Sequence, residues 1–117
     1  MDNVQHYDFI ITGGGCAGLS MVYQLLQSPL LKNKKILLLD KSPKVNNDRT
    51  WCFWEENPGP FEEVVSHQWP RLWMHQGNYS AKLSIAPLSY KMIRGIDFYR
   101  FIEKKNSAAR QRKPFVS

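Results

Sequence analysis

A glycine-rich turn near the start of the chain is the feature that most restricts its fold. Glycines occupy the first, third and sixth positions of Gly13-x-Gly15-x-x-Gly18. The spacing alone is a weak signal, but its surroundings are specific. A short apolar run, Tyr7–Thr12, comes directly before the turn, and a helical pattern, Ala17–Gln27, begins within it. A strand that leads through such a turn into a helix is what a dinucleotide-binding βαβ unit requires.

The residues after the turn complete this pattern. The expected helix carries apolar side chains at helical spacing, at Leu19, Val22, Leu25 and Leu26. Ser28-Pro29 ends the helix because proline lacks a backbone donor. Lys35–Asp40 is a second apolar run of strand length. We therefore expect a buried parallel strand at each end of the helix, joined as a βαβ unit.

Each glycine has a physical role in this interpretation. Gly13 permits a tight turn where a Cβ would clash, and Gly18 brings the helix close to the strands. Gly15 lets a pyrophosphate approach the backbone. The amides of Cys16 and Ala17 then point at the diphosphate from the positive end of the helix. A purely structural glycine turn in another α/β protein is the alternative.

Asp40 ends the second apolar run, 22 residues after Gly18. A carboxylate there accepts hydrogen bonds from a ribose with two free hydroxyls and disfavours a 2′-phosphate, so NADP fits poorly. The turn by itself leaves FAD and NAD open. The candidate cofactor-binding residues are Gly13, Gly14, Gly15, Cys16, Ala17, Gly18, Asp40, Lys41 and Arg49.

Beyond Asp40 the pattern changes from α/β to mostly β. A polar loop and the aromatic segment Asp48–Glu56 come first, and Arg71–Ile85 then predicts a hairpin around Gln76-Gly77-Asn78. Tyr90–Arg94 predicts a short strand, and Asp97 is a candidate cap for a helix over Phe98–Lys105. We divide the chain into a dinucleotide-binding βαβ unit with an aromatic motif (1–56), the start of a β-rich substrate domain with a following helix (57–105) and a basic unpatterned tail (106–117).

Composition restricts the partners and the chemistry. The formal net charge is +6, with a basic group near the C-terminus: Arg100, Lys104, Lys105, Arg110, Arg112 and Lys113. No nucleic-acid fold motif accompanies these charges, so we expect no nucleic-acid binding. A solvated tail is the main interpretation, and contact with anionic lipid is the alternative. Cys16 lies in the glycine-rich turn and Cys52 in the aromatic segment, so we expect no disulfide. The cysteines and the three histidines show no metal-ligand spacing, so we expect no metal site.

One octapeptide in the aromatic segment points to a family. Asp48-Arg49-Thr50-Trp51-Cys52-Phe53-Trp54-Glu55, placed after the YDFIITGGGCAGLS opening, closely resembles the lycopene cyclase family, in its bacterial β-cyclase branch. The combination Arg-Thr-Trp-x-Phe-Trp is far more specific than the glycines. The stretch Tyr90–Tyr99 also resembles the family's segment before the next helix, and the resemblance covers Tyr7 to Ile102.

The resemblance implies an FAD-dependent enzyme with a glutathione reductase-like nucleotide fold and a second, substrate-binding domain. Family members close the ends of lycopene into β-ionone rings without net redox change, yet use reduced flavin. An anionic flavin stabilises the carbocation electrostatically, and aromatic faces add cation–π attraction. Trp51, Phe53 and Trp54 are candidates to line such a pocket, with packing between domains as their alternative role. Arg49 either contacts the flavin or pairs with Asp48 or Glu55.

The chain also departs from the family. Its relatives are much longer, and the acidic segment that they use near the reacting centre has no counterpart here, so the catalytic acid is unknown. We expect a truncated or frameshifted product that is inactive alone and that either associates with itself or another chain or folds only marginally. We expect it in the cytoplasm, with peripheral contact to the membrane that holds a carotenoid as the alternative. Two alternatives stay open: another FAD-dependent oxidoreductase of the same fold, such as a monooxygenase or halogenase relative, and a small non-catalytic dinucleotide-binding module.

Overall fold

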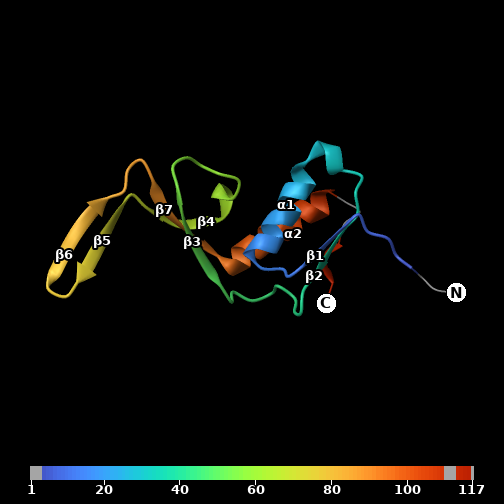
Figure 1. Cartoon of the computed structure of the whole chain (residues 1–117), viewed down its shortest axis with the longest axis horizontal. Coiled ribbons are helices and arrows are strands. Elements are labelled where there is room, and N and C mark those ends of the chain that lie inside the picture. The colour runs from blue at the N-terminus through green and yellow to red at the C-terminus, as the bar shows by residue number, and fades with distance from the viewer. Residues whose placement is uncertain (1–3, 110–112, 117) are drawn as a thin grey trace. The chain divides into compact units, whose positions relative to one another are not determined.

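A computed structural model describes residues 4–109 and 113–116, with the side chains of residues 4–106. These residues form a mixed α/β protein with three small sheets and two α-helices (Figure 1). In chain order the elements are β1 (Phe9–Thr12), α1 (Cys16–Gln27), η1 (Pro29–Leu31), β2 (Ile36–Leu39), β3 (Thr50–Glu55), η2 (Glu62–Val64), β4 (Val65–Trp69), β5 (Arg71–Gln76), β6 (Tyr79–Ser84), β7 (Ser89–Arg94), α2 (Gly95–Ala109) and β8 (Lys113–Val116).

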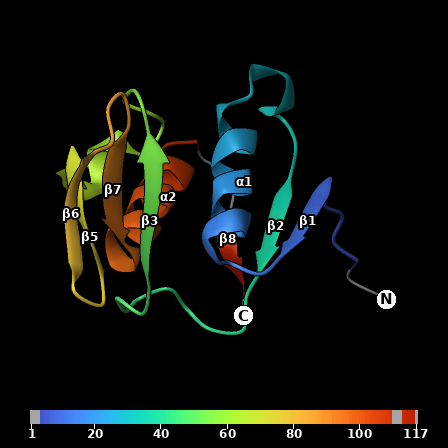
Figure 2. The same ribbon diagram turned by 60° about the vertical axis from the view of Figure 1, so that its left-hand side comes forward.

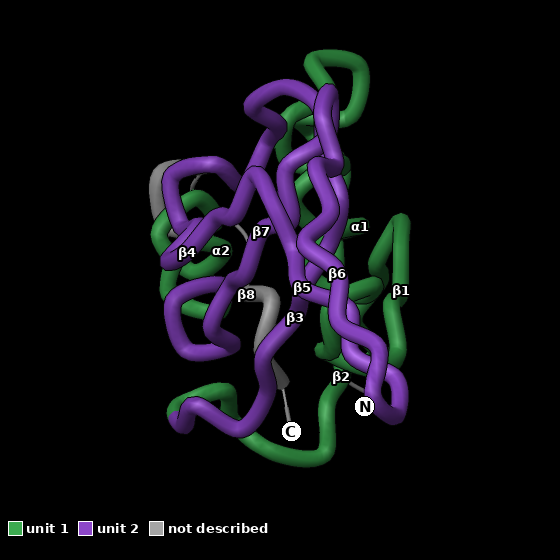
Figure 3. Tube along the Cα trace, turned by 90° about the vertical axis from the view of Figure 1, so that its left-hand side faces the viewer, with its two compact units in different colours: residues 1–45, 99–117 green, residues 46–98 purple. Residues whose placement is uncertain are grey.

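The chain folds as two compact units. Unit 1 consists of residues 1–45 and 99–117, and unit 2 of residues 46–98 (Figure 3). Helix α2 begins in unit 2 and continues into unit 1.

Unit 1 contains a parallel sheet with the strand order β1-β2-β8. The pairing of β1 with β2 runs from Phe9 beside Ile36 to Thr12 beside Leu39. Helix α1 follows β1 in the chain and precedes β2, and Figure 2 shows it alongside these strands. The strand, helix and parallel strand expected from the sequence are therefore present, each within two residues of its expected start.

Burial within this sheet depends on the position of the strand. Ile36 and Leu38 of the central strand β2 are buried. Ile10 of the edge strand β1, in contrast, is 60% exposed. Ile11 faces the helix at Gly18, so alternation turns Ile10 to the opposite face. The expectation that Tyr7–Thr12 forms a buried strand was therefore wrong, because the residues of β1 are only partly buried or exposed.

Helix α1 starts at Cys16, one residue before the expected start, and ends at Gln27 before Pro29. Leu19 and Val22 form its buried face, as their helical spacing indicates. Farther along unit 1, the rings of Tyr23 in α1 and Phe101 in α2 pack with their centroids 5.5 Å apart. This contact joins the two helices.

Secondary structure extends farther toward the C-terminus than the sequence indicates. Helix α2 continues to Ala109, and Lys113–Val116 forms the third parallel strand β8, where the sequence showed no pattern. A four-residue strand is too short to show a periodicity, and only its pairing with β2 identifies it. Arg110 and Arg112, which carry part of the expected basic tail, lie outside the described residues.

Unit 2 is built from antiparallel strands. One sheet has the order β3-β7-β4, and β5 and β6 form a separate hairpin. The hairpin prediction is confirmed: the strands meet at Gly77-Asn78, and Gly77 has a φ of 56°, which glycine adopts without strain. Strand β7 confirms the short strand expected at Tyr90–Arg94.

The start of α2 differs from the expectation that Asp97 caps it. The helix begins at Gly95, and the amide of Ile96 donates to the side-chain oxygen of Asn47 at 3.2 Å. Asp97 lies inside the first turn, where both of its oxygens accept hydrogen bonds from Arg94. A residue distant in sequence supplies the cap, so the local pattern could not identify it.

Candidate functional site

The glycine turn of unit 1 joins β1 to α1 and is fixed by backbone geometry. Gly13 has a φ of 96°, and its amide donates to the carbonyl of Leu39 at the end of β2, at 2.7 Å. A Cβ on Gly13 would meet nothing within 4 Å. Glycine is needed here for its left-handed backbone, and the steric clash expected from the sequence is not the cause.

The other two glycines of the motif differ in their surroundings. A Cβ on Gly18 would fall on the carbonyl oxygen of Gly13, so any other residue there would force the helix away from the turn. A Cβ on Gly15 would meet nothing within 4 Å, so the space in front of it is open. Gly15 is also the N-cap of α1, where no side chain caps the helix. The first amides of α1, at Cys16 and Ala17, therefore lack intrahelical partners.

Asp40 lies against this turn. Its Oδ2 accepts a hydrogen bond from the amide of Gly14 at 3.2 Å, and its Oδ1 accepts one from the amide of Lys41 at 2.6 Å. The ammonium of Lys44 lies 2.8 Å from the same Oδ2. These contacts, with Lys44 the largest cause, lower the pKa of the Asp40 carboxyl despite the opposing effect of burial.

Lys44 is a residue of the site that the sequence did not reveal. Its side chain is 12% exposed, that of Asp40 is 9% exposed, and its ammonium lies 5.6 Å from the centre of the Tyr99 ring. Gly14 makes room for this pair, since a Cβ there would lie 2.5 Å from Asp40 Oδ2 and 3.3 Å from Lys44 Cε. The four-residue spacing from Asp40 is the one local signal, and it falls in a loop where spacing does not predict contact.

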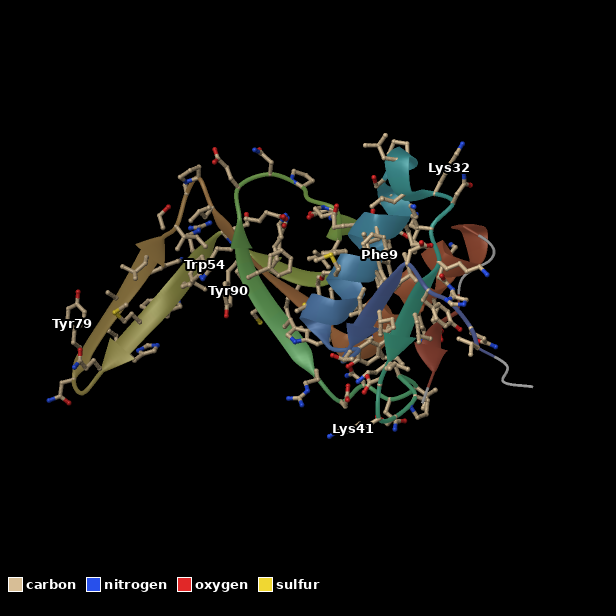
Figure 4. All side chains as sticks on the ribbon, turned by 45° about the vertical axis from the view of Figure 1, so that its right-hand side comes forward. Phe9, Lys32, Lys41, Trp54, Tyr79 and Tyr90 are labelled. Atoms are coloured by element: carbon tan, nitrogen blue, oxygen red, sulfur yellow. The ribbon has the colours of Figure 1, made fainter. Side chains whose placement is uncertain are left out.

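The remaining candidate residues are divided between the two units. Cys16 is a free, half-buried thiol at the first position of α1, and Lys41 is an exposed side chain directly after Asp40 (Figure 4). Arg49 belongs to unit 2, and its backbone carbonyl accepts a hydrogen bond from the amide of Gly95 at 2.7 Å. Glu55, one of its expected partners, pairs instead with Lys91 at 2.8 Å.

The aromatic motif occupies β3, and its side chains alternate between two faces. Trp51 packs edge-on against Phe98, with ring centroids 5.4 Å apart, on the side of the sheet that faces α2. Trp54 lies on the other face, 4.6 Å from Tyr90 (Figure 4). Phe53 shares the face of Trp51, because both are odd-numbered positions of one strand. The expectation that Trp51, Phe53 and Trp54 line one pocket was therefore wrong.

Trp54 belongs to a row of rings across the sheet. Tyr90 pairs with Trp54 on one side and with Trp69 on the other, and the centroids of Tyr90 and Trp69 are 6.1 Å apart. His67 stacks on Trp69 at 5.7 Å. Trp54 is 51% exposed and Trp69 37% exposed, so the aromatic row, Trp54, Tyr90 and Trp69, is an open surface. A side-chain hydrogen bond with Cys52 raises the pKa of the Tyr90 hydroxyl.

The opposite face of the same sheet holds a buried charge. Lys91 is 2% exposed, and its ammonium lies 2.8 Å from Glu55 and 2.6 Å from Glu62. Both carboxylates raise the pKa of Lys91, Glu55 more than Glu62. This triad fixes η2 and the end of β3 on β7. Among the described residues, no three His, Cys, Asp or Glu side chains converge as a metal site would require.

The fold and the turn define a mixed α/β protein whose first helix starts at a glycine turn, with open space where a Cβ of Gly15 would lie. A family model described as lycopene cyclase protein matches residues 8–113. The chain belongs to the lycopene cyclase family, which acts in carotenoid biosynthesis. A search of curated proteins gives no match. In the part of the chain that the structure describes, neither helix is long and apolar enough to cross a membrane.

Proposed function

We propose that this chain is the FAD-binding part of a lycopene cyclase-like flavoprotein. In this proposal unit 1 is a Rossmann-type βαβ unit that holds the adenosine diphosphate half of FAD. The observation that carries the proposal is the glycine turn between β1 and α1, with Asp40 hydrogen-bonded to its Gly14 amide. Membership of the lycopene cyclase family favours FAD, and NAD is the weaker alternative.

The residues of the turn fit such a ligand. The open space at Gly15 admits a diphosphate close to the backbone. The amides of Cys16 and Ala17 would donate to it, and the positive end of a 12-residue helix adds attraction. No acidic residue lies in the first turn of α1 to oppose the ligand's charge. Asp40, at the end of the neighbouring strand, would then accept the ribose hydroxyls.

In the same proposal the aromatic row of unit 2 binds the apolar end of a linear carotenoid. Three rings on adjacent strands form a band about 10 Å wide, given strands about 5 Å apart. Their π faces suit a conjugated hydrocarbon and attract a developing positive charge. Reduced flavin, when bound, would supply negative charge that stabilises a carbocation. Trp54 and Tyr90, which are 4.6 Å apart, are the closest pair and would make the main contact.

The same row explains why we expect the 117-residue chain not to cyclise lycopene. Cyclisation needs an acid, a flavin and an apolar enclosure held in register. Trp54 is 51% exposed, so water reaches the rings. A carbocation formed there would be captured by water before a neighbouring double bond could attack it. Incubation with FAD, a reductant and lycopene in liposomes should give no β-ionone-ringed product above a no-protein control. Turnover above that control would overturn this expectation.

Calorimetric titration with FAD tests the cofactor assignment. Gly15→Asp should abolish binding, because it places a side chain and a negative charge in the open space where the diphosphate would lie. Asp40→Ala should weaken binding by about 1–3 kcal/mol through the lost hydrogen bonds. The matched control is Gly77→Asn, at the hairpin turn of unit 2, where the backbone is left-handed and a Cβ meets nothing within 4 Å. FAD affinity that is unchanged in both site variants would refute the assignment.

A further inference from the structure

The further inference concerns Lys44 and rests on the proposed dinucleotide site. In the structure Asp40 is not a free carboxylate. Its Oδ1 accepts a hydrogen bond from the amide of Lys41. Its Oδ2 accepts one from the amide of Gly14 and forms an ion pair with the ammonium of Lys44. The side chains of Asp40 and Lys44 are 9% and 12% exposed, so the pair is sheltered from water.

The limited number of acceptor sites on the Asp40 carboxylate makes Lys44 and a ribose compete for it. A carboxylate offers about four acceptor sites, two on each oxygen. On Asp40, Gly14 and Lys44 use both sites of Oδ2, and Lys41 uses one site of Oδ1. A ribose that donates one hydroxyl to each oxygen needs a free site on both. The amide of Gly14 is fixed by the turn, so the lysine is the group that must leave.

We propose that Lys44 determines which ribose the site accepts, because it competes with the free 2′- and 3′-hydroxyls for Asp40 and can pair with a 2′-phosphate. Its ammonium cancels the carboxylate charge that would otherwise repel the phosphate. The site should therefore discriminate against NADP less strongly than the presence of Asp40 alone would suggest. The Tyr99 ring, 5.6 Å from the ammonium, gives the displaced cation a second contact within unit 1.

Matched pairs of dinucleotides test this proposal on the whole 117-residue chain. NADH and NADPH differ only in the 2′-phosphate, and the fluorescence of each reports its own binding. Lys44→Gln should bind NADH about 3- to 10-fold more tightly than wild type, because Asp40 is freed. It should bind NADPH about 5-fold more weakly, because a cation is lost beside an exposed phosphate. The NADPH/NADH ratio of dissociation constants should thus rise more than about 10-fold.

Three control variants separate competition from a general charge effect. Lys34→Gln removes the same charge from an exposed position before β2 and should leave the ratio unchanged. Lys44→Arg keeps the cation and should keep the wild-type ratio. In an Asp40→Asn background, Lys44→Gln should no longer tighten NADH binding, because no carboxylate remains to be freed. Circular dichroism confirms that each variant is folded.

The outcomes distinguish this proposal from the proposed function. If wild type binds FAD and Lys44→Gln leaves the NADPH/NADH ratio within twofold, the role of Lys44 is wrong while the FAD site stands. If wild type binds FAD but neither nicotinamide dinucleotide, unchanged FAD affinity in Lys44→Gln overturns the proposal, and tighter FAD binding supports it. If wild type binds none of the three ligands, the proposed site and the role of Lys44 both fail.

Discussion

The close approach of α1 to the glycine turn makes Gly18→Ala a sensitive test of the fold of unit 1. The added methyl group would fall on the carbonyl oxygen of Gly13 and 3.1 Å from its carbonyl carbon. The helix would have to retreat by about 1.5 Å to restore van der Waals separation. Leu19 and Val22, which are almost fully buried, would then lose packing against the sheet.

The cost of this retreat can be weighed against the gain from alanine. Overpacking costs about 1–3 kcal/mol, and an immovable backbone obstacle places this case at the upper end. Alanine returns up to about 1 kcal/mol through helix propensity. The net loss is about 2 kcal/mol, which corresponds to about 30-fold less protection from amide hydrogen exchange. Peptides that cover β2, the central strand, report this loss in unit 1 alone.

The matched control for this experiment is Gly15→Ala. Gly15 has a φ of −80°, and a Cβ there meets nothing within 4 Å, so protection should stay within about threefold of wild type. Equal protection of β2 in Gly18→Ala and Gly15→Ala would show that the close approach at Gly18 is not real.

Three further predictions concern charges and rings. The pKa of Asp40 is lower in the folded protein than its unfolded value near 3.8. The ionised carboxylate therefore stabilises unit 1 at pH values above the unfolded pKa, and this stabilisation is lost as the pH falls through the folded pKa. Acid titration of β2 protection should show the loss in wild type and not in Asp40→Asn. Lys91→Met should destabilise unit 2 by about 1–3 kcal/mol. This loss is smaller than that from breaking a fully buried ion pair, because the partners Glu55 and Glu62 are partly exposed. Amide hydrogen exchange in β7 measures it. In urea unfolding, Trp51→Ala should lower the free energy of unfolding of unit 2 by about 2–4 kcal/mol, and Trp54→Ala by less than about 1 kcal/mol. Equal losses would contradict the placement of the two rings on opposite faces of the sheet.

Local signals in the sequence were enough for the elements that hold the candidate site. The glycine turn, the helical spacing of Leu19 and Val22 and the apolar run before Asp40 each depend on neighbouring residues alone. The hairpin at Gly77 was predictable for the same reason, since a turn residue between two short runs determines it.

The features that the sequence did not reveal depend on contacts between distant segments. Lys44 reaches Asp40 through the path of a loop, which no periodicity encodes. Strand β8 exists through its pairing with β2, and Asn47 caps α2 from across unit 2. The separation of Trp51 from Trp54 was available in principle. Assignment of Asp48–Glu56 to a strand would have placed them on opposite faces.

A crystal structure of the chain with FAD is the most direct test of the proposed cofactor site. The diphosphate should lie within hydrogen-bond distance of the amides of Cys16 and Ala17, in the open space at Gly15. The adenosine ribose should lie at Asp40, with Lys44 moved off Oδ2. An adenosine diphosphate group bound away from the turn between β1 and α1 would contradict the assignment.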